Sequence, residues 1–146
     1  MAIDRSGKWW KGTEPADLDE FLSAYSAGGY PVAKAAHARC GLCGREEFAV
    51  LVDDEEGCAV RVCASCRDEK PLLDSQEYLA DAALESAACP CGGEVFNVAV
   101  GFALYDGSED VRWVYLGLRR ISDGVLGNYA DWKIDYSPSS HLVHAV

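Results

Sequence analysis

The segment "ARCGLCGREEFAVLVDDEEGCAVRVCASCRDEK", residues 38–70, decides the fold of this chain. Apolar residues alternate along 48–52 and again along 58–62, which predicts two β-strands. The acidic segment DDEEG at 53–57 lies between them and predicts the connecting turn. A Cys-x-x-Cys pair stands at each end of this hairpin: Cys40 with Cys43, and Cys63 with Cys66. Pairing of the two strands therefore brings four thiols together at the open end.

Four convergent cysteines predict a metal site. A closed tetrahedral set of four thiolates is typical of structural Zn²⁺, although iron also occupies four-cysteine sites. We therefore expect one bound zinc ion. The site would be negatively charged, and neighbouring arginines are expected to offset that charge: Arg39, Arg45 and Arg67. His37 is a surplus candidate ligand, for which we expect a surface position or a place behind the ligands. Cys58 is expected to be a small buried apolar residue.

The arrangement resembles a zinc ribbon, a family defined by two cysteine knuckles joined by a hairpin. The resemblance covers about residues 38–68. The first knuckle, CGLCG, has Gly44 directly after its second cysteine, as the family usually does, whereas the second, CASCRD, has Arg67 there. The resemblance implies a structural zinc site and a role in binding nucleic acid or protein.

A helix is predicted before the hairpin, over residues 13–29. Thr13 is its candidate N-cap, and a proline follows in the first turn, where the missing N–H costs nothing. Four apolar residues recur at helical spacing and define one face: Leu18, Phe21, Leu22 and Tyr25. We expect either Trp9 or Trp10 to pack on this helix.

After the hairpin, the sequence predicts a second helix over residues 74–88, followed by three strands. These strands are expected at 94–105, 111–119 and 126–134. The predicted fold class is therefore α+β, with a zinc-ribbon hairpin, an antiparallel C-terminal sheet and two short helices. We expect one compact domain, 1–146, with four sub-regions: a helical segment 1–37, a ribbon 38–70, a helix 71–88 and a ribbon-like sheet 89–146.

The C-terminal sheet begins like a second copy of the hairpin. Residues 91–100, CGGEVFNVAV, share Cys, Gly, Glu, Phe and two Val with CGREEFAVLV at 43–52. At the second knuckle, Arg120 stands where the first copy has Cys63. The residues that could form a second metal site are Cys89, Cys91, Asp123, His141 and His144. Three interpretations remain open: a relic without metal, a redox-sensitive cysteine pair, or a second metal site.

Composition limits the possible partners. The chain has 146 residues and a net charge of −11, which disfavours nucleic acid because phosphate binding needs Lys and Arg. The charge suits solubility or an acidic face for a basic partner. The sequence predicts no transmembrane segment, no membrane association and no secretory signal. We therefore expect a cytoplasmic protein with reduced thiols.

These features favour a non-enzymatic, zinc-stabilised protein-interaction module, either an adaptor or an antagonist of a basic partner. No phosphate-binding loop or metalloprotease motif is present. The alternatives are a thiol redox or metal-responsive switch that uses Cys89 and Cys91, and a zinc enzyme whose second site is open to water.

Overall fold

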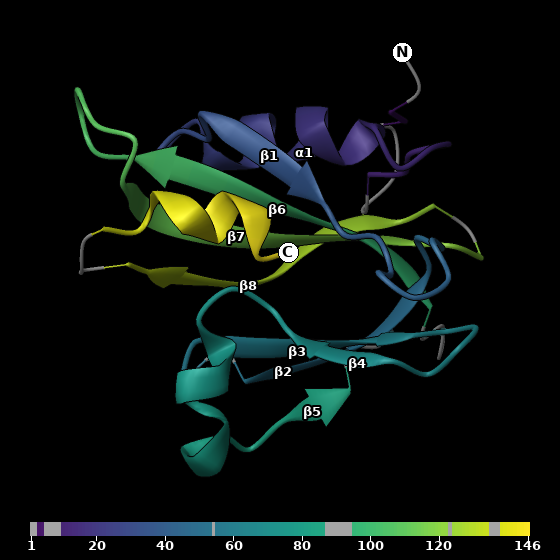
Figure 1. The fold of residues 1–146 in the computed structure, drawn as a ribbon. Helices are drawn as coiled ribbons and strands as arrows, with labels where there is room; N and C mark the ends of the chain where they lie inside the picture. The colour runs from purple at the N-terminus through teal and green to yellow at the C-terminus, as the bar shows by residue number, and fades with distance from the viewer. Residues whose placement is uncertain (1–2, 5–9, 54, 87–94, 123, 135–137) are drawn as a thin grey trace.

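The computed structural model describes residues 3–4, 10–53, 55–86, 95–122, 124–134 and 138–146 (Figure 1). One α-helix and eight strands occur in these ranges: α1 (Asp17–Ser26), β1 (Lys34–His37), β2 (Phe48–Asp53), β3 (Cys58–Cys63), β4 (Glu69–Pro71), β5 (Glu85–Ser86), β6 (Phe96–Leu104), β7 (Val111–Arg120) and β8 (Leu126–Lys133). Three short 3₁₀ helices complete them: η1 (Ser75–Glu77), η2 (Leu79–Asp81) and η3 (Ser140–His144).

All strands belong to one antiparallel sheet that folds over on itself. Its main path is β4-β3-β2-β6-β7-β8, with β1 paired to β6 and β5 paired to β2. Figure 1 shows three layers: α1 above, the β1-β6-β7-β8 part in the middle, and β2 to β5 below. The larger apolar core draws on both parts of the sheet, from Phe48 and Leu72 below to Phe102 and Leu116 above.

The α1 helix confirms the N-terminal prediction but is shorter than the predicted range 13–29, and Thr13 is not its cap. Residues 13–16 form a turn before the helix, in which Oδ2 of Asp17 accepts hydrogen bonds from the backbone N–H of Thr13 at 2.8 Å and of Glu14 at 3.2 Å. Three of the four predicted face residues are buried, while Tyr25 is 52% exposed. Trp10 packs edge-on against Phe21 with ring centroids 5.9 Å apart, as expected for one tryptophan of the pair.

A glycine on β7 lets the helix approach the sheet closely. A Cβ atom at Gly117 would lie 3.0 Å from Cδ2 of Leu22, which is completely buried on α1. Leu22 and Leu18 therefore pack directly over the strand and form a second apolar cluster with Ala99 and Tyr115.

The predicted hairpin is confirmed as a pair of strands. β2 and β3 pair from Phe48↔Cys63 to Asp53↔Cys58 without interruption. Asp53 closes the turn, since its Oδ1 accepts hydrogen bonds from the backbone N–H of Glu55 at 3.0 Å and of Glu56 at 3.2 Å. The knuckle residues are therefore held at the end of the hairpin opposite this turn.

The second predicted helix is wrong. Over 74–86 the chain forms η1, η2 and the short strand β5 instead. Tertiary hydrogen bonds take the place of helical ones: Oγ of Ser75 accepts from the backbone N–H of Ala59 at 2.8 Å, and Oδ2 of Asp53 accepts from that of Ala83 at 2.8 Å. The fold is thus mostly antiparallel sheet with one α-helix and 3₁₀ turns. Residues 87 and 88 lie outside the described ranges.

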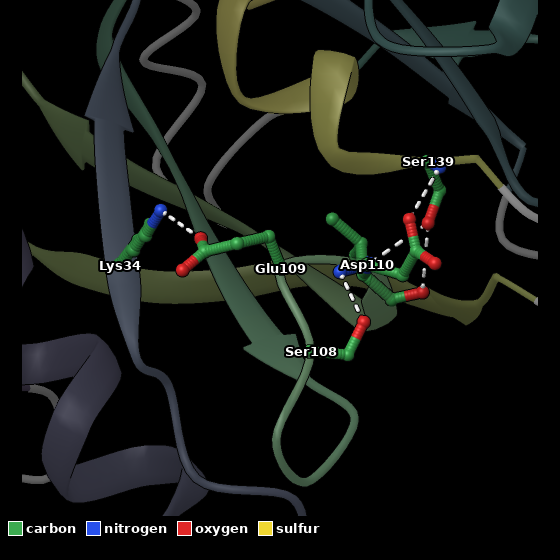
Figure 2. Close-up of polar contacts among 6 residues, drawn as sticks. Lys34, Ser108, Glu109, Asp110 and Ser139 are labelled. Atoms are coloured by element: carbon green, nitrogen blue, oxygen red, sulfur yellow. Dashed lines mark hydrogen bonds and ion pairs between the residues drawn. The ribbon is translucent and has the colours of Figure 1, made fainter.

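The C-terminal strands form where the sequence predicts them, and a serine secures their edge. Ser139 is completely buried, and its Oγ accepts a hydrogen bond at 2.8 Å from the backbone N–H of Val111, at the start of β7. Its own N–H donates to Asp110 at 2.9 Å (Figure 2). On the other side of this turn, Lys34 of β1 forms an ion pair with Glu109. The C-terminal segment is thereby fixed to the sheet.

Candidate metal centre

Four cysteine sulfurs converge at the open end of the hairpin. The Sγ atoms of the two Cys-x-x-Cys pairs all lie within 4.8 Å of one another: Cys40, Cys43, Cys63 and Cys66. Across the two pairs, Cys40 is 3.5 Å from Cys66 and Cys43 is 3.5 Å from Cys63. The sequence spacing and the strand pairing therefore predicted this cluster correctly.

The first knuckle is a tight backbone turn. The N–H of Gly44 donates to the carbonyl of Cys40 at 2.9 Å, and the N–H of Cys40 donates to the carbonyl of Arg45 at 2.8 Å. Gly44 has φ 76°, a left-handed conformation that glycine adopts without strain. The side chain of Arg39 also binds the knuckle, since its Nε donates to the carbonyl of Gly44 at 3.0 Å.

The second knuckle has the same turn with a residue that tolerates it less well. The N–H of Arg67 donates to the carbonyl of Cys63 at 3.0 Å, and the N–H of Cys66 points to Sγ of Cys63 at 3.5 Å. Arg67 has φ 68°, in the left-handed region that is unfavourable for residues with a Cβ atom. The turn therefore costs backbone free energy, which metal binding at this knuckle would offset.

The cluster has an inner and an outer side. Cys40 is 2% exposed and Cys63 is completely buried, whereas Cys43 and Cys66 are exposed. The inner sulfurs belong to the main apolar core. A bound ion would thus join the hairpin to the core on one side and lie near solvent on the other.

The four thiols cannot all carry charge without a cation. Hydrogen bonds from backbone N–H groups, first that of Cys66, lower the pKa of Cys63 to about 6. A backbone hydrogen bond from Asp68 favours the thiolate of Cys66, yet the contact with Cys40, burial and the other sulfurs raise its pKa to about 12. Like charges this close oppose one another, and a divalent metal ion removes the conflict.

The donor set fits a soft or borderline metal. Thiolates select zinc, copper(I) or iron–sulfur chemistry over the hard ions magnesium and calcium. In the described part of the chain, no histidine or carboxylate completes this cluster. His37 lies elsewhere, with Nε2 2.7 Å from Oδ1 of Asp19. Cys58 is completely buried as expected, and burial raises the pKa of its thiol.

Sequence reasoning missed one charged residue beside the cluster. Arg39 binds the first knuckle, and Arg45 and Arg67 are exposed, but Arg61 is only 2% exposed. The available signal was its position on β3, two residues before Cys63, because residues i and i+2 of a strand share a face.

The second candidate site is only partly described. Cys89, Cys91 and Asp123 lie outside the described residues. His141 and His144 are exposed on η3 and join no metal-binding cluster within the described ranges. Arg120 is 4% exposed and lies at the end of β7.

The backbone around Arg120 matches the second knuckle closely. Phe96 pairs with Arg120 as Phe48 pairs with Cys63, and Phe48 and Phe96 pair with each other. In the second knuckle, the N–H of Arg67 donates to the carbonyl of Cys63 at 3.0 Å. In the same way, the N–H of Gly124 donates to the carbonyl of Arg120 at 2.8 Å. Gly124 has φ 80°, as Arg67 has φ 68°. The knuckle turn thus recurs with arginine in the place of the buried cysteine.

No protein family, curated protein or solved structure matches this chain. Within the described residues, no helix has the length and apolar character needed to cross a membrane. The interpretation of the cysteine cluster therefore depends on its own geometry and chemistry.

Proposed function

We propose that this protein is a zinc-stabilised, non-enzymatic protein-interaction module whose metal is structural. The observation that carries the proposal is the set of four convergent cysteine sulfurs, all within 4.8 Å of one another, with no other ligating group in the described cluster. Four protein thiolates fill a tetrahedral zinc ion and leave no position for water or substrate. A site of this kind contributes to folding rather than to chemistry.

The zinc-ribbon interpretation gains support from the two knuckle turns and from the hairpin of two six-residue strands between them. The matching turn at Arg120 supports a duplication in which the C-terminal copy replaced a metal ligand with arginine. In this interpretation the first copy needs zinc, and the second depends on the apolar core that both copies share.

An acidic face for a basic partner is the second part of the proposal. Glu55 and Glu56 are exposed at the tip of the hairpin, and Glu85 of β5 is exposed beside it, paired with Val52. The turn is held in place through Asp53, which also binds the N–H of Ala83. Together with a net charge of −11, this face favours a lysine- or arginine-rich protein and disfavours phosphate backbones.

Metal counting tests the first part of the proposal. We expect native mass spectrometry to find one zinc ion per chain in the wild type, in Cys89→Ser and in Cys91→Ser, with modest loss of thermal stability in the two variants. A second zinc equivalent that disappears in either variant, or in His141→Ala or His144→Ala, would instead favour a zinc enzyme with an open site. A Cys89–Cys91 disulfide formed under mild oxidation would favour the redox switch.

A binding comparison tests the second part. At physiological salt we expect no sub-micromolar affinity for a DNA or RNA duplex, because the negative field of the protein repels phosphate. A lysine-rich peptide should bind, and its affinity should fall with added salt and in the double variant Glu55→Gln, Glu56→Gln. Fluorescence anisotropy measures both ligands. Tight duplex binding, or peptide binding indifferent to salt and to the variant, would contradict the acidic-face proposal.

A further inference from the structure

Arg61 is a buried charge in the core of the molecule. It lies on β3 between Val60 and Val62, and only 2% of its surface is exposed. Arginine is almost never fully buried unless it is paired, because removal of its charge from water is strongly unfavourable. A fold that buries this side chain must therefore supply compensation.

The direct contacts of Arg61 are two main-chain oxygens and one aromatic ring. Its Nη2 donates to the backbone oxygen of Arg39 at 3.3 Å and to that of Val146 at 3.5 Å. Its Cζ lies 4.7 Å from the centroid of the Phe48 ring. Nε and Nη1 have no hydrogen-bond partner in the described part of the chain, and no carboxylate side chain within those ranges forms an ion pair with Arg61.

A second cation, Lys70, lies beside Arg61. Lys70 pairs with Arg61 across β3 and β4, and its Nζ also donates to the backbone oxygen of Val146, at 3.3 Å. Burial and the charge of Arg61 both lower the pKa of Lys70. Two neighbouring cations thus share the main-chain oxygen of Val146, and further negative charge nearby would stabilise both.

The cysteine cluster lies next to Arg61, both along β3 and across the contact with Arg39. Arg61 and Cys63 are two residues apart on β3 and so share a face of the strand. Arg61 also binds the backbone of Arg39, the residue directly before Cys40. Cys63 and Cys40, which directly follows Arg39, are the two buried cysteines of the cluster.

We propose that Arg61 is the buried counter-cation of the metal–thiolate centre, and that its charge favours the zinc-bound state. The inference rests on the proposed binding of zinc by the four cysteines. Zinc with four thiolates keeps a net negative charge. The two buried sulfurs hold part of that charge in the apolar core, away from water. A fixed guanidinium there stabilises the loaded centre, as groups behind the ligands do in other metal sites.

The test separates charge from packing. Arg61→Met keeps an apolar chain of similar length without charge, whereas Arg61→Lys keeps the charge with a different shape. Arg45→Met is the matched control, because Arg45 also neighbours a ligand in sequence but is exposed. Zinc affinity is measured by chelator competition, and the visible spectrum of Co²⁺ bound in place of zinc reports whether four thiolates still ligate.

We expect Arg61→Met to bind zinc about 10- to 100-fold more weakly, with Arg61→Lys and Arg45→Met close to wild type. Equal losses in Arg61→Met and Arg61→Lys would show a packing role and overturn the inference, as would unchanged affinity in Arg61→Met. If Arg61→Met fails to fold, Arg61→Gln replaces it as the uncharged variant, and its zinc affinity is compared with that of Arg61→Lys. A wild type without zinc would overturn the proposed function itself.

Discussion

Replacing Cys43 by serine should release the metal and unfold the β2–β3 hairpin. Structural zinc in small domains contributes on the order of 10 kcal/mol to folding, and a hairpin of two six-residue strands is at best marginally stable alone. The thiol of Cys43 is exposed, so its removal leaves no cavity in the core. Any large effect must therefore come from lost ligation.

Cys58→Ala is the matched control for that substitution. Cys58 is a completely buried cysteine on β3, but it lies outside the four-sulfur cluster. We expect it to keep one zinc per chain and to lose only the stability that belongs to a small cavity. Metal content and amide NMR spectra of the hairpin compare the variants. A wild-type protein that is folded, reduced and free of metal would show that the hairpin does not need zinc.

The hairpin and the cysteine cluster could be predicted because both follow from local rules. Strand alternation and the acidic turn set the pairing of β2 with β3, and the pairing alone determines where the cysteines meet. The later strands followed from the same alternation. The match between 43–52 and 91–100 aligned Arg120 with Cys63, and the structure pairs Arg120 with Phe96 as it pairs Cys63 with Phe48.

The remaining features depend on tertiary contacts that have no local pattern. Residues 74–86 have helical spacing, but Ser75 and Asp53 offer hydrogen bonds to backbone groups far away in sequence and hold the segment in 3₁₀ turns and a strand. β1 becomes a strand because β6 pairs with it. The position of Arg61 two residues before Cys63 indicates its face of β3, but its burial depends on contacts with Arg39 and Val146, which are far away in sequence.

Phe96→Ala should be the most damaging substitution outside the metal centre. Phe96 is completely buried and is paired with Phe48 on one side and Arg120 on the other, where the β2–β3 part of the sheet meets β6 and β7. The ring of Tyr129 packs edge-on against it, with centroids 5.4 Å apart. Truncation of a buried phenylalanine costs about 3–5 kcal/mol, and bound zinc does not fill the cavity that the lost ring leaves.

Val95→Ala is the control for Phe96, because Val95 is the preceding residue and is 37% exposed. Urea unfolding of zinc-loaded protein should show a large fall in the midpoint for Phe96→Ala and a change within about 0.5 kcal/mol for Val95→Ala. If Phe96→Ala lowered stability no more than Val95→Ala, the two parts of the sheet would not share one cooperative core. If it melted the C-terminal strands but left the zinc-bound hairpin intact, the metal centre would be stable independently of the sheet that covers it.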